Sequence, residues 1–532
     1  MNSREIVVGK FTLETLTLGM YKNPLVVYRE YIQNSSDSID HAIKTGLIQD
    51  SEALIKVNIN HKTHSISIED NGTGVSGKEV YNVLCDIGNA RKDYRTDKGF
   101  RGIGRLGGLA YCDKLVFKTS YHGEDFASMI TWDGVALKEL LRPDNHESSS
   151  LGDVVRRIVS QDVAEEAIDA HYFVVTMQGI SVHHRGTLLH DHEVKQYLSE
   201  VAPVPYDHQQ FMHALEIDDA FKDENHRFDQ YKVILNDSAI PIKKPYKTSF
   251  ITGNQERTKQ RDNVKEIRLL TDEKGRYSGW IAITNFYGNI RDLSIRGIRL
   301  RKGNILIGDS TTFNQFFLAE NDVANSWFMG EIFIHDPEVI PNSQRDDFEP
   351  NDAFMSLKES LTELAEQFRK EYRRDMSEFN STVKQVNTIE SRLAEIKEEV
   401  QTSGVTSDHK REQLLKEKDN LEKSCQKAKQ KLNKLISKKV EDEDKKQVLQ
   451  NIQKKVEGIE KEFVEVENTI IDAPYSTKCD LPSSYPNEVR KVYERIIAVI
   501  DAYFVQDIET AKNLRTKIIE ELAVNPKSKK RK

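Results

Sequence analysis

The feature that most constrains this chain is a segment near its start that places polar side chains where a helix normally buries apolar ones. Residues 28–40 read YREYIQNSSDSID, with Glu30, Asn34 and Asp37 at i, i+4 and i+7. On a helix these three side chains share one face. The apolar residues that can pack on a sheet are Val27, Tyr31 and Ile39. Two interpretations remain open at this point: a site that faces a cavity, or an ordinary solvated helix face.

Two glycine motifs follow and favour a site. Residues 65–74 read SISIEDNGTG, an alternating strand that runs into Asp70 and a turn containing Gly72 and Gly74. Residues 98–108 read KGFRGIGRLGG, whose backbone is flexible enough to surround phosphate groups with N–H donors. A Rossmann loop is the weaker interpretation, because this glycine run follows a polar stretch and not a strand.

The order of the motifs carries a family resemblance. E-x-x-x-N-x-x-D-S, then D-N-G-x-G, then G-x-G-x-x-G-G occur in turn within residues 30–108. This order resembles the GHKL ATPases, which include gyrases, ninety-kilodalton heat-shock chaperones, histidine kinases, microrchidia ATPases and MutL-type proteins. Tyr21-Lys22-Asn23 before Arg29-Glu30 is similar to the chaperones, and residues 99–102 (GFRG) are similar to MutL-type proteins. The implied fold is α+β, a Bergerat-type ATP-binding sandwich with ATP and Mg²⁺ as ligands.

The site roles follow from chemical need and from the resemblance. Glu30 is the candidate base that activates water, and Asn34 offers Mg²⁺ an amide oxygen with Asp37 orienting the shell. By the resemblance, Asp70 accepts a hydrogen bond from the adenine amino group. The remaining nucleotide contacts expected are Gly72, Gly74, Lys92, Lys98, Gly99, Phe100, Arg101, Gly102, Ile103, Gly104, Arg105, Gly107 and Thr176.

Thr176 is included because the family's late strand usually opens with G-T. Here His171-Tyr172 hold that place and Thr176 stands further along the strand. Residues 85–101 are polar and contain glycine, so we expect a lid that closes over bound ATP.

Four regions are expected along the chain. They are an ATP-binding domain at 1–205, a transducer-like (S5-like) α/β domain at 206–350, an antiparallel coiled-coil arm at 351–472 and a helical region with a basic tail at 473–532. The first should contain a helix over 21–46, strands at 53–59, 65–69, 114–119, 126–132 and 171–178, and a helix at 195–201. Strands at 231–235, 280–284, 298–301 and 331–335 should form the second, with turns at 236–237 and 301–304.

The second region ends in residues 339–346, VIPNSQRD. Its N-x-x-R resembles the L-P-L-N-V-S-R-E run in the middle domain of the chaperones. The resemblance implies that Arg345 reaches across to the γ-phosphate, and the alternative is an ordinary loop arginine.

After residue 350, glycine nearly vanishes and apolar residues step by threes and fours over 376–400, 414–435 and 452–470. The pattern predicts long amphipathic helices, the first two joined by a glycine turn near Gly404. Two more helices are expected at 486–504 and 507–522. The basic tail at 526–532 is expected to be a solvated terminus, with a localisation signal or nucleic-acid contact as the alternative.

Composition excludes several classes. The net charge of −8 over 532 residues does not fit a protein that coats nucleic acid. Four scattered cysteines indicate neither a zinc knuckle nor a disulfide framework, and no apolar run could span a bilayer. Four histidines at 183, 184, 190 and 192 lack zincin spacing, so a surface loop is preferred there to a metal site. A cytoplasmic protein is expected.

The function expected is that of an ATP-hydrolysing conformational machine. It would be a homodimer that works as an ATP-gated clamp on a protein or DNA client, in chaperone-like work or bacterial defence. Its partners could be encoded in the same operon, and no binding to a membrane is expected. One alternative is a nucleotide-regulated coiled-coil scaffold without turnover. Another is a histidine kinase, which would need a phospho-acceptor domain before its N-box, whereas 29 residues precede Glu30. Neither a MutL-type nuclease motif nor a topoisomerase cleavage domain is visible.

Overall fold

The structure is a computed structural model. It describes residues 8–17, 23–88, 102–142, 144, 150–222, 228–253, 260–286, 288–318, 321–405, 408–437, 443–473, 487–504, 510–511, 513–515 and 517–518. The chain divides into two compact units, Met1–Arg373 and Arg374–Lys532. Each unit is described by itself.

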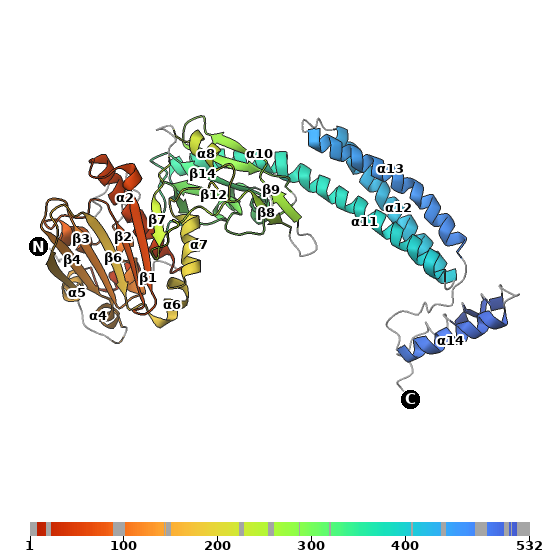
Figure 1. Cartoon of the computed structure of the whole chain (residues 1–532), viewed down its shortest axis with the longest axis horizontal. Coiled ribbons are helices and arrows are strands. Elements are labelled where there is room, and N and C mark those ends of the chain that lie inside the picture. Colours follow the sequence, from red (N-terminus) through yellow and green to blue (C-terminus); the bar gives the residue numbers. More distant parts are fainter. Residues whose placement is uncertain are drawn as a thin grey trace, which may run out of the picture. The chain divides into compact units, whose positions relative to one another are not determined.

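A seven-stranded sheet organises the N-terminal part of the first unit (Figure 1). Its strand order is β5-β4-β3-β6-β2-β1-β7, with every pair antiparallel except β1 and β7. The strands are β1 (Leu54–Asn60), β2 (Ser65–Asp70), β3 (Lys114–Ser120), β4 (Phe126–Asp133), β5 (Val159–Glu165), β6 (Tyr172–Gln178) and β7 (Lys232–Leu235). In β1 and β2 buried and partly exposed residues alternate, so the apolar side chains of both strands point to one face.

Helix α2 (Val26–Lys44) lies against β2 on that face (Figure 1). It shares one core with β1, β2 and β3. The helix ends in a Schellman motif, because the Gly46 N–H bonds to the Ile43 carbonyl and the Leu47 N–H to the Ala42 carbonyl. Gly46 supplies the left-handed φ of +72° that this motif requires. The predicted helix and its stop are therefore confirmed, with a start five residues later than expected.

Smaller elements complete this part of the fold. They are α1 (Phe11–Thr17), η1 (Asp50–Glu52), α3 (Val80–Cys85), η2 (Gly104–Ala110), α4 (Gly134–Leu140), α5 (Leu151–Ile158), α6 (Val182–Leu188) and α7 (Asp191–Val201). The prediction of a surface loop at 181–192 is wrong, since α6 and the start of α7 occupy it. Two of the histidines bond at the starts of these helices: His190 caps α7 by accepting the Glu193 N–H, and His184 bonds to Ser181, which precedes α6.

A five-stranded sheet follows in the same unit, in the order β10-β11-β14-β12-β13. Its strands are β10 (Glu266–Thr271), β11 (Tyr277–Ile283), β12 (Gly297–Lys302), β13 (Ile305–Ile307) and β14 (Met329–Ile334). Gly303 and Asn304 join β12 to β13 with φ of +54° and +55°, the signature of a two-residue hairpin turn. The predicted strand at 231–235 belongs elsewhere, because β7 pairs in parallel with β1 of the first sheet.

Further elements surround the five-stranded sheet. They are α8 (Ala214–Ala220), the hairpin β8 (Ser249–Thr252) and β9 (Gln260–Asn263), η4 (Thr312–Phe316), α9 (Asn321–Ala324), η5 (Asn325–Trp327), α10 (Asp352–Phe368) and the π-helix η6 (Arg369–Arg374). The predicted turn at 236–237 is observed directly after β7, with φ of +51° and +52°.

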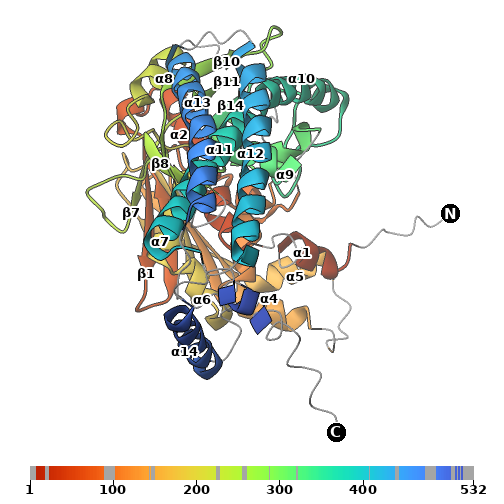
Figure 2. The ribbon, with the colours of Figure 1, turned by 90° about the vertical axis from the view of Figure 1, so that its right-hand side faces the viewer.

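Three long helices dominate the second unit and run side by side (Figure 2). They are α11 (Asp375–Ser403), α12 (Asp408–Ser437) and α13 (Glu443–Ile471). Their apolar seams pack on one another, with Leu393, Ala428 and Val456 almost completely buried. Gly404, at φ +67°, ends α11 where the glycine turn was expected. These seams are thus packed against one another within the chain.

Helix α14 (Asn487–Tyr503) is the last regular element described. The second helix expected at 507–522 falls mostly outside the described residues, as does the basic tail. No described helix combines the length and the apolar character needed to cross a bilayer.

Candidate active site

Helix α2 carries the polar stripe into the interior of the domain. Glu30 is 7% exposed and Asp37 is 8% exposed, while Asn34 between them is half-buried. A chance stripe on a solvated face would be exposed, so the solvated-face interpretation does not hold. Among the described residues, the Asn34 side chain makes no hydrogen bond, which leaves its amide oxygen available as a ligand.

The Glu30 carboxylate meets two arginines. Arg345 Nε lies 3.6 Å from Glu30 Oε1, and Arg29 Nη2 lies 3.4 Å from the same oxygen. Arg29 also donates to the carbonyls of Gln344, at 2.9 Å, and Arg345, at 3.4 Å. The loop after β14 therefore rests on the start of α2. This brings Arg345 to Glu30. That Arg345 reaches the γ-phosphate stays a prediction.

The glycine-rich segment closes the site from a third side. The α-carbon of Gly104 lies so near Glu30 that a Cβ there would come within 2.3 Å of Glu30 Oε2. From residue 104 the chain forms η2, and the Gly108 N–H bonds to the Tyr31 hydroxyl at 3.0 Å. Gly107 is buried under this turn, so the second half of the expected open loop is a helical turn packed on α2.

The other predicted contacts of this segment are placed as follows. Gly102 has φ +67°, Ile103 precedes η2, and Arg105 donates to the Asp86 carbonyl at the end of α3. The structure therefore directs Arg105 to α3. Five predicted residues lie outside the described residues: Lys92, Lys98, Gly99, Phe100 and Arg101.

Asp70 ends β2 and is 2% exposed. The Gly72 N–H donates to its Oδ1 at 3.0 Å, which fixes the carboxylate against the turn. The turn is itself anchored, since Thr119 Oγ1 accepts the Val75 N–H at 2.8 Å and His171 Nδ1 lies 2.9 Å from the Gly72 carbonyl oxygen. Gly74, at φ +65°, passes so close to the Ser120 carbonyl that no side chain would fit.

Thr176 is not brought to this site. It pairs with Ser67 across β2 and β6, whereas Asp70 pairs with Phe173. Successive residues of a strand point to opposite faces, so Thr176 lies on the face away from Asp70. Thr119, which pairs with Phe173 on its other side, is the threonine on the Asp70 face.

The charges differ between the two ends of the site. A cleft of about 460 Å³ beside Asp70 is lined by four carboxylates, those of Glu52, Glu69, Asp70 and Asp169. The guanidinium groups of Arg29 and Arg345 lie at the Glu30 end. A triphosphate would be repelled from the first end and attracted to the second.

Comparison with known proteins agrees with this geometry. Residues 22–154 match the family model of the histidine kinase-, DNA gyrase B-, and HSP90-like ATPases. The N-terminal domain is of the GHKL type. The matched stretch of this GHKL domain includes α2, the Asp70 turn and η2, and it ends before Arg345.

The curated relatives are bacterial chaperones. The chaperone protein HtpG of Legionella pneumophila (strain Lens) is 29% identical over 143 residues, which cover 23% of each chain. HtpG of Polaromonas naphthalenivorans is 28% identical over 138 residues, covering 23% of this chain and 22% of the relative. The chain thus spans less than a quarter of the length of these relatives.

Three residues that organise the site were not predicted as site residues: Arg29, Thr119 and His171. Arg29 precedes Glu30 on the helix that carries the polar stripe, so its place there could have indicated a role in the site. His171 was marked only as holding the place of the family's late G-T, and nothing marked Thr119, because the partners of both in the turn lie more than 40 residues away.

A metal site made only of protein side chains was the alternative raised by the four histidines. In the part of the chain that the structure describes, no three His, Cys, Asp or Glu side chains gather in a way that could hold a metal ion. Cys85, Cys112 and Cys425 are buried free thiols, and Cys479 lies outside the described residues. Burial raises the pKa of Cys112 to about 12, so this thiol is unreactive.

Proposed function

We propose that this chain is an ATPase that converts ATP hydrolysis into movement between its domains. The observation that carries the proposal is the contact between Glu30 on α2 and Arg345 on the loop after β14, at 3.6 Å. A carboxylate from α2 and a guanidinium from the loop after the second sheet converge there beside the Gly104 backbone. A site assembled in this way can respond to a ligand by changing how the domains fit.

Each residue has a role in hydrolysis. Glu30 takes a proton from the attacking water, and the two arginines nearby stabilise the charge that develops on the transferred phosphoryl group. Arg29 holds the loop of Arg345 through two backbone carbonyls. Asp70, held by the Gly72 amide, selects adenine by accepting from its amino group.

The residues present also fit Mg²⁺. The half-buried Asn34 amide lies on the same helix face as Glu30 and has no competing hydrogen bond among the described residues. Asn34 would hold the ion, with Asp37 orienting its shell. Mg²⁺ supplies charge neutralisation for the phosphate oxygens.

The client is proposed from the relatives. The HtpG proteins are named as chaperones, which favours a protein client, and DNA is kept as the second candidate. A scaffold without turnover and a histidine kinase are the competing functions. Phosphate release measured at saturating ATP tests them together: turnover supports the ATPase, no turnover supports the scaffold, and radiolabel retained on the protein supports the kinase.

We also infer that the active form is a homodimer held by α14. This helix buries Tyr493 and Ile497 within the chain, yet its other side exposes apolar residues at spacings of four, three and four. These residues are Val492, Ile496, Val499 and Tyr503, exposed by 55%, 41%, 64% and 85%. Such a stripe matches the seam of a two-stranded coiled coil, and a second copy offers the same stripe.

Light scattering tests the dimer. The Val499→Asp chain should be monomeric, while the control Val464→Asp, at an α13 residue that is 61% exposed, should remain dimeric. A dimer that survives Val499→Asp would overturn the assignment to α14. The lid, predicted at 85–101, and closure of the N-terminal domains on ATP form the rest of the clamp hypothesis. A compaction of the chain in X-ray scattering with a non-hydrolysable analogue would support that hypothesis.

A further inference from the structure

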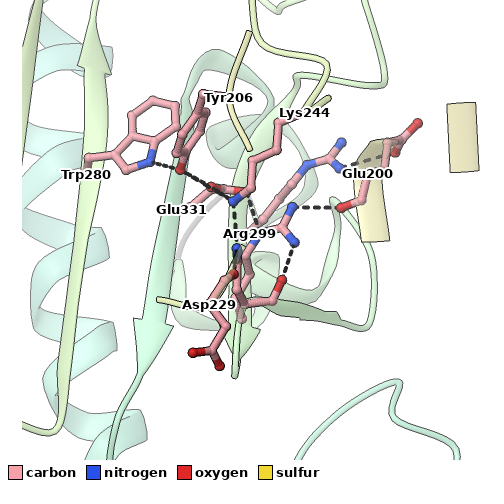
Figure 3. Close-up of polar contacts among 9 residues, drawn as sticks. Glu200, Tyr206, Asp229, Lys244, Trp280, Arg299 and Glu331 are labelled. Carbon is pink, nitrogen blue, oxygen red and sulfur yellow. Dashed lines mark hydrogen bonds and ion pairs between the residues drawn. The ribbon is translucent and has the colours of Figure 1, made fainter. Parts of the chain in front are cut away.

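The five-stranded sheet encloses charged side chains with no exposure to solvent (Figure 3). Lys244 Nζ lies 2.6 Å from Glu331 Oε2, and Arg301 Nε bonds to Glu331 Oε1. We call Lys244, Arg301 and Glu331 the ion cluster. Two cations face one anion, and removing such groups from water costs several kcal/mol per ion, so hydrophobic stability alone does not account for them.

The polar atoms around the ion cluster are bonded to one another. The Tyr206 hydroxyl donates to Glu331 and accepts from Trp280 Nε1 at 2.8 Å, as Figure 3 shows. Lys244 also donates to Asn304 Oδ1 at 2.9 Å. Although burial opposes it, Arg301 and Lys244 lower the pKa of Glu331 to about 2. A bonded network of this kind fixes one geometry of the strands that carry it.

The network extends beyond its own sheet to α7. Arg301 Nη2 donates to the Glu200 carbonyl at 2.7 Å, and Arg299 Nη1 lies 3.2 Å from the Glu200 carboxylate. Glu200 is in the last turn of α7, where helix carbonyls lack partners and cations are favoured. Helix α7 in turn packs against α2, which carries Glu30.

The same strands hold Arg345 from the other side. β12 carries Arg299 and Arg301 and continues through the Gly303-Asn304 turn into β13. Directly after β13, the Gly308 N–H donates to the Arg345 carbonyl at 2.8 Å. Arg345 has φ +54°, an unusual conformation for a non-glycine residue that persists only where the surroundings impose it. The contacts thus close a ring: α2, α7, β12, β13, Arg345 and back to Glu30.

We propose that Arg301 and Arg299 are positioning residues, which set the place of Arg345 relative to Glu30 by fastening the end of α7 to β12. The proposal rests on the ATPase function proposed above. Neither guanidinium touches the reacting groups, and each acts through the hairpin β12–β13. Because a displacement of about 1 Å can cost a hundredfold in rate, a loosened ring should slow hydrolysis without weakening ATP binding.

A matched pair of variants tests this in the full chain. Arg301→Met and Lys244→Met each leave Glu331 with one buried basic partner, so both disturb the ion cluster itself. Of these two side chains, Arg301 bonds to α7 and Lys244 has no such bond among the described residues. We expect Arg301→Met to lower kcat by about 10- to 100-fold with KM for ATP unchanged, and Lys244→Met to stay within about threefold of wild type. Equal losses in both variants, or a rise in KM alone, would overturn the proposal.

A distance measurement gives a readout that does not depend on turnover. Spin labels at Lys44→Cys on α2 and Ser343→Cys beside Arg345, both exposed positions, report the ring directly in a Cys479→Ser background. The distance distribution should broaden with Arg301→Met and stay narrow with Lys244→Met. An unchanged distance distribution in a folded Arg301→Met chain would refute the proposal that Arg301 fastens α7 to β12.

A second variant and the wild type keep the test decisive. If Arg301→Met does not fold, Arg299→Met removes the contact with the Glu200 carboxylate and should broaden the same distribution while lowering kcat by about 3- to 10-fold. A narrow distribution there counts against the proposal. A wild-type chain that does not hydrolyse ATP contradicts the proposed function alone, since the spin labels still report on the ring.

Discussion

The two ends of the candidate site are built in different ways. At the Asp70 end, a strand, a turn and the next strands of one sheet supply every contact described above, and the Gly72 amide that holds Asp70 is two residues away. At the Glu30 end, the contacts between Arg29 and the loop of Arg345 join residues 315 and 316 positions apart. The first end is as rigid as its sheet, while the second depends on how two sheets fit together.

This difference separates binding from turnover. An end that is complete within one domain can hold a nucleotide base in every arrangement of the chain. An end completed by a distant segment of the chain can stabilise the transition state only when that segment is in place. Changes at the Asp70 end should therefore alter affinity, and changes at the Glu30 end should alter rate.

The largest effect is expected from Asp70→Asn. Asparagine loses the charge-assisted bond to the adenine amino group, and its own NH₂ can face that donor. We expect no nucleotide binding measurable by calorimetry. The control is Asp162→Asn, the same exchange at an exposed position on the edge strand β5, which should bind ATP normally. Binding by Asp70→Asn equal to wild type would exclude this residue from base recognition.

Glu30→Ala should show the converse behaviour. Loss of a general base lowers turnover by about 10²- to 10⁴-fold, while the contacts at the Asp70 end persist, so affinity is kept. Single-turnover phosphate release and analogue binding measure the two quantities separately. Glu30→Gln, which keeps the shape beside Gly104, should be equally slow. Normal hydrolysis by either variant would remove Glu30 from the base role.

The two ends also differ in what the sequence revealed. The polar stripe of α2 and the Asp70 turn were predictable because local spacing determines helix faces and turns. Thr176 was misplaced because successive residues of a strand point to opposite faces. The pairing of β6 with β2 decides which residues of β6 share the face of Asp70, and the spacing of residues in the sequence does not reveal that pairing. The contact of Arg345 with Glu30 was not predicted: the family resemblance implied only that Arg345 reaches the γ-phosphate, and residue patterns do not specify how distant parts of a chain meet. The contact of β7 with β1 was missed for the same reason.

Arg345→Ala tests the Glu30 end, which depends on how the two sheets fit together. Its guanidinium acts mainly in the transition state, so hydrolysis should slow by about 10- to 1000-fold with little change in ATP affinity. Arg345→Lys keeps the charge but loses the planar fork, and should recover only part of the rate. A fall in affinity without a change in the rate at saturation would contradict the division between the two ends.

The scaffold behind the Glu30 end should make stability depend on pH. Burial first, and then Arg301, lowers the pKa of Lys244 to about 7. The folded chain then binds fewer protons than the unfolded chain between that pH and the ordinary lysine pKa, so stability rises with pH across this window. The slope contributed is at most about 1.4 kcal/mol per pH unit. Urea unfolding at pH 7 and pH 9 should show this rise in wild type and a smaller one in Lys244→Met, and equal slopes would contradict it.

The smallest effect is expected from Thr119→Val, which tests whether the Asp70 end is held by its sheet. Valine keeps the shape but cannot accept the Val75 N–H or donate to the Tyr172 carbonyl, two bonds of 2.8 and 3.0 Å. Each such bond contributes about 0.5–1.5 kcal/mol to the stability of the fold. Losing both bonds loosens the turn after Asp70, and with it the position of the Asp70 carboxylate. ATP affinity should fall by about 3- to 10-fold. Because Thr119 has no part in the contacts between domains, kcat at saturating ATP should equal that of wild type. A lower kcat with unchanged affinity would show that the two ends are coupled through the sheet, and binding and turnover could then no longer be assigned to separate ends.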